Sequence, residues 1–294
     1  MTLGLLIQSI IAGIMNGVVY ALIGLGIAAI YKGSGVINAM QGEFSIIAAI
    51  FASLAVSAAG WPYPVAALAG IASGMVIGLV VDLAFVRHMR IRNAAHDSYL
   101  LLILGLAITL AALVLQFAGS GSFSLPAYEP IEVWIILDAV LQSQALWLMG
   151  LSSLAIVAVR LFYRHTMLGM RMMAASIDDE GAMSIGVNVS LMRTLTFTLG
   201  GLLGAIAGVL ISTVLPVDHQ IGLILTLKGF AAAILGGLTN PIGAAVGGIT
   251  IGLLESLAIV SVSSAYKDAI TFAMLILIMI FLPNGMLGRG LRRS

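Results

Sequence analysis

The sequence of 294 residues has no cysteine and little charge. The absence of cysteine excludes disulfide bonds and thiolate metal sites. The four histidines are scattered, and none belongs to a His-Glu-x-x-His pair that could bind zinc. There is no Gly-x-x-x-x-Gly-Lys-Ser/Thr loop for nucleotide phosphates and no convergent set of catalytic side chains. We therefore expect no metal site, no other cofactor and no enzymatic activity in this chain.

The charged fraction of only 9%, against about 25% in soluble domains, indicates a membrane protein. Hydrophobic residues make up 61% of the sequence, and the mean hydropathy is +1.16. Apolar runs of about 20 residues, long enough to cross a bilayer as helices, recur along the whole chain. The formal charge of +1 gives no indication of nucleic-acid binding. The sequence predicts an all-α, polytopic transmembrane helix bundle that forms a single domain over residues 1–294.

Polar and turn-forming residues divide the apolar runs into eight or nine spans, the seventh of them short. No basic residue precedes the first run, so we interpret it as a span and not as a cleaved signal peptide. The loop from Gly119 to Gln144 contains Val133 to Leu137, whose aromatic and aliphatic side chains suit a segment lying on the membrane surface. The predicted spans cover about residues 3–30, 36–58, 63–86, 98–118, 144–163, 191–214, 222–239, 243–262 and 266–283.

The arginines predict the orientation of the chain, because basic residues avoid the translocated side of a membrane. The predicted spans place three arginine clusters on one side, the cytoplasm, together with the C-terminus. The N-terminus and the acidic loop with Glu129, Glu132 and Asp138 then lie outside. The clusters are Arg87, Arg90 and Arg92; Arg160, Arg164, Arg171 and Arg193; and Arg289, Arg292 and Arg293.

Many of the 34 glycines recur at four-residue intervals, which places them on one face of a helix. Such faces let neighbouring helices approach closely. We expect dense helix packing from them and no direct function for any single glycine. The sets are Gly13 and Gly17; Gly70, Gly74 and Gly78; Gly200, Gly204 and Gly208; Gly243 and Gly247; and Gly248 and Gly252.

Polar residues gather near the start of the second predicted span. Asn38, Gln41 and Glu43 lie within six residues, flanked by Gly35 and Gly42. Unpaired polar groups at membrane depth are costly, and transporters place broken helices where they line a cavity or a substrate site. We therefore predict a broken helix near residues 35–44 whose Asn38, Gln41, Gly42 and Glu43 belong to a substrate pathway. The alternative is an ordinary helix start, with Asn38 as a cap and Glu43 in an early turn.

Lys228 is the second candidate pathway residue, since it stands alone in the apolar seventh span. The alternative is that its amine extends to the outer membrane interface. Glu255, Asp82 and Gln8 are expected to be paired packing or interface residues. An ion-coupled secondary transporter would need buried acids, for which Glu43 and Glu255 are the plausible choices.

A short charged segment lies inside the cytoplasmic loop of about residues 164–190. Its acids favour a helix N-terminus, and its small residues keep one helix face narrow. The spacing from Glu180 to Gly186 resembles the "EAA" loop by which bacterial ABC permeases press a cytoplasmic helix into their ATPase. The alternative is that the acids only keep the loop soluble. The predicted ATPase-coupling residues are Asp178, Asp179, Glu180, Gly181, Ala182 and Gly186.

Four further motifs resemble the branched-chain amino-acid ABC transporter permease family, and the chain length resembles its LivH-type subunit. They occur in the order found in that family and span nearly the whole chain. Ala39 and Met40 depart from the family pattern, which leaves the substrate open. The motifs are Asn16 to Gly26; Gly35 to Asn38 with Gly42 to Phe44; Leu227 to Ala231 leading to Leu235 to Leu238; and Leu282 to Gly288.

The resemblance implies an inner-membrane permease of a binding-protein-dependent ABC importer. It implies branched-chain or other hydrophobic amino acids, or a related small organic solute, as substrate. It also implies as partners a second, LivM-like permease subunit, two ABC ATPase subunits, a periplasmic substrate-binding protein and membrane lipid. The alternative function that we retain is an ion-coupled secondary transporter.

Overall fold

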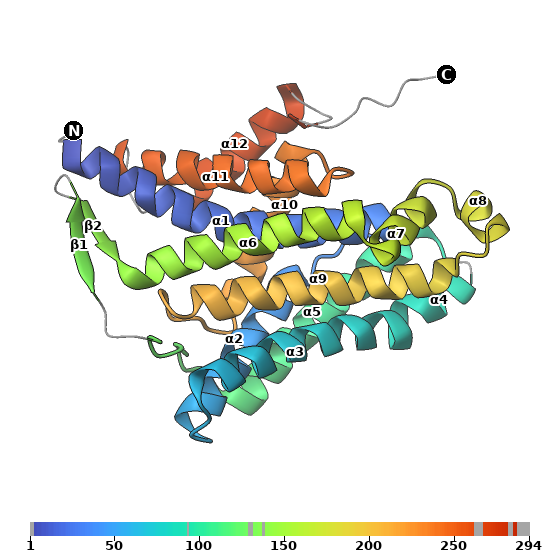
Figure 1. Ribbon diagram of the computed structural model, residues 1–294, viewed down its shortest axis with the longest axis horizontal. Coiled ribbons are helices and arrows are strands. Elements are labelled where there is room, and N and C mark those ends of the chain that lie inside the picture. The colour runs from blue at the N-terminus through green and yellow to red at the C-terminus, as the bar shows by residue number, and fades with distance from the viewer. Residues whose placement is uncertain are drawn as a thin grey trace.

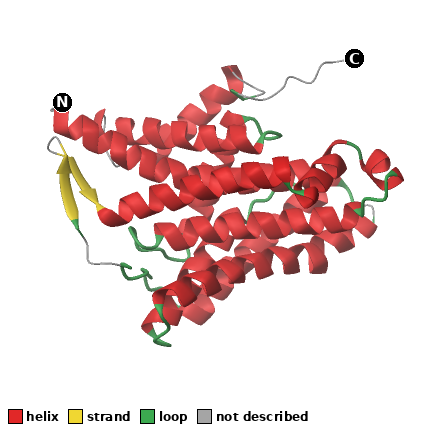
Figure 2. Cartoon of the chain, viewed as in Figure 1, coloured by secondary structure: helices red, strands yellow, loops and turns green. Residues whose placement is uncertain are grey.

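The computed structural model describes residues 3–92, 94–128, 132–136, 139–261, 267–281 and 285–286. Within these ranges the chain is a bundle of helices with one small β-hairpin (Figures 1 and 2). The first half of the chain contains α1 (Leu3–Ser34), α2 (Gln41–Ser57), α3 (Tyr63–Val81), the π-helical turn η1 (Asp82–Val86), α4 (Arg87–Ile91), α5 (His96–Ala118), β1 (Val133–Ile136) and β2 (Ala139–Gln142). The second half contains α6 (Ser143–His165), α7 (Met167–Ile177), α8 (Asp179–Ser184), α9 (Val189–Ile211), α10 (Ile221–Gly236), α11 (Pro241–Ser261) and α12 (Lys267–Phe281).

The helix bounds confirm the predicted polytopic bundle. In the part of the chain that the structure describes, six helical segments are long and apolar enough to cross a membrane, among them the continuous rod of α3, η1 and α4 from Tyr63 to Ile91. The other three predicted spans correspond to shorter helices, with 17 residues in α2, 16 in α10 and 15 in α12. At 1.5 Å per residue these reach about 22 to 26 Å, somewhat less than the bilayer core of about 30 Å. The seventh span is short, as predicted.

The long helices run side by side along the longest axis of the molecule (Figure 1). One end carries the start of α1 and the hairpin, and the opposite end carries α4, α7 and α8. Two aqueous sides of a membrane therefore correspond to two structurally different ends of the bundle. The predicted cytoplasmic arginines of α4, α6 and α7 fall toward the end with α8.

The glycine sets do lie where helices touch, as predicted. The most extensive helix pair among the described residues joins α1 to α11. A Cβ atom added to Gly17 would lie 2.8 Å from the Ile249 Cα, and one added to Gly252 would lie 2.4 Å from the Gly13 carbonyl oxygen. The hydroxyl of Ser256 donates to the Ser9 carbonyl oxygen at 2.6 Å across the same seam. Any side chain at these glycines would force the two helices apart.

The loop between α5 and α6 differs from the prediction of a single surface segment. Val133 to Ile136 form β1, which pairs in antiparallel register with β2, so that Trp134 stands opposite Leu141. Gln8 of α1 accepts a hydrogen bond from the Val140 backbone at 2.7 Å, which fastens the hairpin to the bundle and confirms Gln8 as an interface residue. Glu132 is described, whereas Leu137, Glu129, Pro130 and Asp138 lie outside the described residues, as do Leu282 to Asn284 and the arginines of the C-terminal tail.

Candidate functional site

The chain leaves the helical conformation between α1 and α2, where the sequence predicts a broken helix. We call residues 35–43 the polar break. Gly35, directly after α1, has a φ of +72°, a left-handed conformation that favours glycine. α2 then begins at Gln41, and its N-cap residue, Met40, makes no side-chain capping bond. The backbone therefore reverses direction inside the bundle.

The two amides of the polar break are completely buried and bond to one another. Asn38 donates to the Gln41 Oε1 atom at 2.8 Å and accepts from the Met40 backbone amide at 3.1 Å. Gln41 in turn donates to the Gly200 carbonyl oxygen of α9 at 2.7 Å. Burying these amides is tolerable because each finds a partner. In this arrangement they hold the shape of the break and fasten it to α9.

Gly42 lets α2 lie directly against α10. Its backbone amide donates to the Thr226 hydroxyl at 2.8 Å. A Cβ atom at Gly42 would lie 1.8 Å from the Gly222 carbonyl oxygen, a separation that no side chain could occupy. The contact between the two helices thus requires glycine at this position.

Glu43 differs from its neighbours in the polar break. Its side chain is 3% exposed, and its Oε2 atom has no hydrogen-bond partner among the described residues. The carboxylate lies against Gly222 of α10, where an added Cβ would come within 2.4 Å of Oε1. The Oε2 atom of Glu43 can therefore accept a hydrogen bond from a group outside the described residues.

Lys228 is buried and does not extend to the interface. Its amine donates to the Glu255 carboxylate of α11 at 2.6 Å and to the Tyr20 hydroxyl of α1 at 3.3 Å. It also lies 5.3 Å from the centre of the Tyr20 ring. The amine and carboxylate thereby join three helices, and these contacts go to α1 and α11, away from the polar break on α2.

The sequence analysis predicted that Glu255 is paired but did not identify Lys228 as its partner. The sequence does contain a pattern that indicates this pair. The two residues are lone opposite charges in the consecutive spans α10 and α11. Because an unpaired charge is costly at membrane depth, lone opposite charges in neighbouring spans are expected to pair.

The predicted coupling residues form a capped helix followed by a turn at one end of the bundle. Asp178 caps α8 by accepting from the Glu180 backbone amide at 3.1 Å, and Asp179 and Glu180 occupy the first turn. Ala182 is buried. The prediction that Gly186 helps to keep one helix face narrow was wrong, because Gly186 lies after the end of α8. Its φ of +81° is a left-handed conformation that favours glycine, so the turn explains the residue.

One ion pair connects α8 to α9, and a second lies within the rod of α3, η1 and α4. Asp179 of α8 pairs with Arg193 of α9. The next residue, Thr194, donates to the buried Asp82 carboxylate at 2.5 Å, and Arg90 pairs with the other Asp82 oxygen at 3.2 Å. Asp82 therefore is a paired packing residue, as predicted, and it stands at the start of the π-helical turn η1.

A polar cavity of about 480 Å³ opens beside α8. The end of α1, the α7–α8 turn and α9 form its walls. Asp178, Asp179 and Glu180 line it together with Lys32 and Arg193. The predicted coupling acids thus line the same cavity as Lys32 of α1 and Arg193 of α9.

Comparison with known proteins identifies the family. Residues 9–279 match the family model described as "Branched-chain amino acid transport system / permease component". The permease protein LivH of the high-affinity branched-chain amino acid transport system of Escherichia coli K12 is 29% identical, with 96% of each chain covered. The corresponding permease BraD of Pseudomonas aeruginosa is 27% identical with the same coverage. The galactofuranose transporter permease YtfT of E. coli is 27% identical, covering 74% of this chain and 60% of that protein. The chain belongs to the family of permease components of branched-chain amino acid transport systems.

Proposed function

We propose that this permease component imports branched-chain or other hydrophobic amino acids, or a related small organic solute, in an ABC importer of the bacterial inner membrane. The observation that carries the proposal is the match to the family model over residues 9–279, together with LivH and BraD relatives aligned over 96% of the chain. The departures at Ala39 and Met40 border the buried amides and are the reason to leave the exact solute open.

The energy source in this proposal is a pair of ABC ATPase subunits. The sequence has no nucleotide-binding loop of its own. We assign α8, within the cytoplasmic loop of about residues 164–190, as the element that contacts the ATPase. Its capped N-terminus, exposed acids and position beyond the long helices support this role. A periplasmic binding protein would deliver the solute to the opposite end, and a second, LivM-like permease would complete the pathway.

The orientation follows from the same assignment. With α8 in the cytoplasm, the C-terminal arginines also lie in the cytoplasm and the β-hairpin lies outside. The arginines of α4, α6 and α7, at the α8 end, support it because basic residues favour the cytoplasmic side.

Glu43 is the pathway residue that we propose to meet the solute, with Asn38, Gln41 and Gly42 forming the frame that positions it. Its unpartnered buried oxygen supports this division of roles. Lys228, which the sequence also suggested, is better explained as part of the buried ion pair with Glu255. Because Glu255 pairs with Lys228, only Glu43 of the two candidate acids would be left to carry a coupled ion.

The test is reconstitution of this chain with its second permease, ATPases and binding protein in proteoliposomes. We expect uptake of leucine, isoleucine or valine that requires both ATP and the binding protein and that persists when ionophores collapse proton and sodium gradients. Uptake driven by an ion gradient without ATP would overturn the importer assignment. ATP-dependent uptake confined to sugars would overturn the amino-acid assignment alone.

The same system tests the role of Glu43. In Glu43→Gln, uptake should fall several-fold while the binding protein keeps its affinity, because that affinity resides in another polypeptide. Unchanged uptake would show that the carboxylate is structural.

A further inference from the structure

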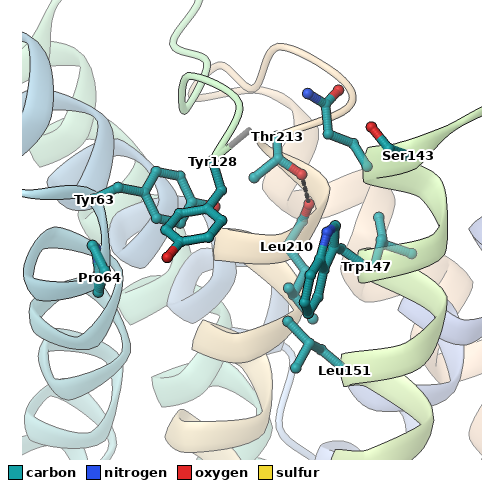
Figure 3. A pocket seen from close by; sticks show the side chains of 10 residues that line it. Tyr63, Pro64, Tyr128, Ser143, Trp147, Leu151, Leu210 and Thr213 are labelled. Carbon is teal, nitrogen blue, oxygen red and sulfur yellow. Dashed lines mark hydrogen bonds between the residues drawn. The ribbon is translucent and has the colours of Figure 1, made fainter. Parts of the chain in front are cut away.

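The end of the bundle that carries the hairpin contains a hydrophobic cavity of about 310 Å³ between α3, α6 and α9. Figure 3 shows the rings of Tyr63 and Tyr128 on one side of it and Trp147 and Leu151 of α6 on the other. The two tyrosine rings contact each other with centroids 5.3 Å apart. Leu148 and Leu210 provide further apolar lining. The cavity is therefore a slot with an aromatic rim.

The slot runs from the helix ends into the membrane. Its lining begins at Tyr63 and Ser143, the first residues of α3 and α6, and reaches Leu151. Eight residues of helix separate Ser143 from Leu151, a depth of about 12 Å at 1.5 Å per residue. Tyrosine and tryptophan favour the boundary between headgroups and hydrocarbon, which is the level of the rim. The slot thus spans that boundary and the outer part of the hydrocarbon.

One wall of the slot is open to the surroundings of the bundle. Trp147 is 52% exposed and Leu151 is 42% exposed, although both are large apolar side chains on a membrane helix. Leu148, one position after Trp147, is buried against the core. The open side therefore faces outward from α6, where acyl chains can reach it.

A buried amide gives the slot a polar end. Gln144 lines the slot and is only 8% exposed, and its Nε2 atom has no acceptor among the described residues. The hydroxyls of Thr213 and Ser143, which also line the slot, are engaged in hydrogen bonds. Thr213 donates to the Leu210 carbonyl oxygen at 2.8 Å (Figure 3), and Ser143 accepts from the Glu132 backbone amide at 3.3 Å. A buried donor without an acceptor costs free energy that a ligand oxygen would recover.

We propose that this slot binds one membrane phospholipid, with an acyl chain between the tyrosines and Trp147 and an ester carbonyl oxygen accepting from Gln144. A phospholipid has both parts in the required order, since its ester groups lie at the headgroup boundary above the hydrocarbon. The ten lining residues include no lysine, arginine, aspartate or glutamate. Recognition therefore depends on the acyl and ester parts and is indifferent to headgroup charge.

Native mass spectrometry of the assembled transporter tests this site by counting retained phospholipids. Gln144→Leu removes the donor at nearly constant shape, and Leu151→Trp fills the slot. Gln142→Leu and Leu154→Trp are matched controls, because both side chains are exposed and neither lines the slot. We expect both site variants to retain one phospholipid fewer per chain than the wild type and both controls. Equal retention in all five proteins would overturn the proposal.

Two further measurements separate a phospholipid from other occupants. Phosphatidylcholine and phosphatidylglycerol should compete equally for the site, and retention of only the anionic lipid would contradict an uncharged recognition site. A photoreactive benzoylphenylalanine in place of Trp147 should form an adduct with the mass of a phospholipid. An adduct with the second permease or the binding protein would show that a polypeptide covers the slot instead.

Discussion

At the scale of single residues, some buried charged side chains form ion pairs that stabilise the fold, and others have no ionic partner among the described residues. Lys228 and Glu255 bond at 2.6 Å with side chains only 4% and 3% exposed. A buried ion pair gains little over a well-packed apolar pair, but removing one partner leaves an uncompensated charge. Glu43 differs because its carboxylate makes no ion pair among the described residues, whereas Glu255, whose Oε2 atom also lacks a hydrogen bond, pairs with Lys228.

The Lys228 and Glu255 pair predicts strong coupling between two substitutions. Lys228→Met should destabilise the protein by about 3–5 kcal/mol, because the Glu255 carboxylate is then left buried and unpaired. The double variant Lys228→Met with Glu255→Leu should recover much of that loss. Stability is measured as the temperature at which the purified full chain loses its monodisperse form. Losses that simply add in the double variant would show that the two residues do not depend on one another.

At the scale of elements, α9 contacts both regions that we propose to be functional, α8 and the polar break. Its start binds α8 through Arg193 and η1 through Thr194, and its middle accepts the hydrogen bond from Gln41. α9 also packs extensively against α1, α2 and α3. If α8 is the coupling element, we expect its displacement to reach α9, which contacts the polar break.

This arrangement predicts the effect of loosening α8 from α9. Asp179→Asn weakens the pair with Arg193 and should reduce the solute transported per ATP hydrolysed several-fold, while the ATPase rate without solute persists. Asp97→Asn is the matched control, since Asp97 is an exposed acid in the first turn of α5. The ratio is measured in proteoliposomes that contain the assembled transporter. A wild-type ratio in both Asp179→Asn and Arg193→Gln would mean that this pair does not transmit movement of α8.

The sequence predicted helices better than it predicted contacts between them. Span bounds such as 98–118 and 243–262 lie within a few residues of α5 and α11, because apolar length is a local property. The hairpin was missed because strands of four residues are too short to show an alternating pattern. The non-helical residues 35–40 overlap the predicted break at 35–44, but α2 is continuous from Gln41 and carries Glu43 in its first turn, as in the alternative of an ordinary helix start. The bond from Gln41 to Gly200 was not predictable, because it joins residues 159 positions apart. Likewise, only the three-dimensional turn after α8 explains Gly186.

At the scale of the whole molecule, the two ends of the bundle offer different chemistry. The hairpin lies at one end of the bundle and α8 lies at the other (Figure 1). The aromatic slot includes the first residues of α3 and α6, and the polar cavity lies beside α8. In the proposed orientation, the hairpin end would face the binding protein and the α8 end would face the ATPases.

The natural absence of cysteine makes this orientation directly measurable. Ser122→Cys and Ser184→Cys place single thiols at exposed positions of the two ends. In intact spheroplasts, a membrane-impermeant maleimide should label Ser122→Cys, and Ser184→Cys should become reactive only after the membrane is opened. The cysteine-free wild type is the background control. The reverse labelling pattern would invert the proposed topology.

The contact between α1 and α11 can form only late in synthesis, because the two helices lie near opposite ends of the chain. Ser9 and Ser256 meet across it although 247 residues separate them. At about 5–20 residues per second, a ribosome needs about 12 to 50 seconds between the two. During that interval the glycine-lined face of α1 has entered the bilayer without its final neighbour. We expect the insertion machinery, or a helix synthesised between α1 and α11, to cover this face of α1 until α11 is synthesised.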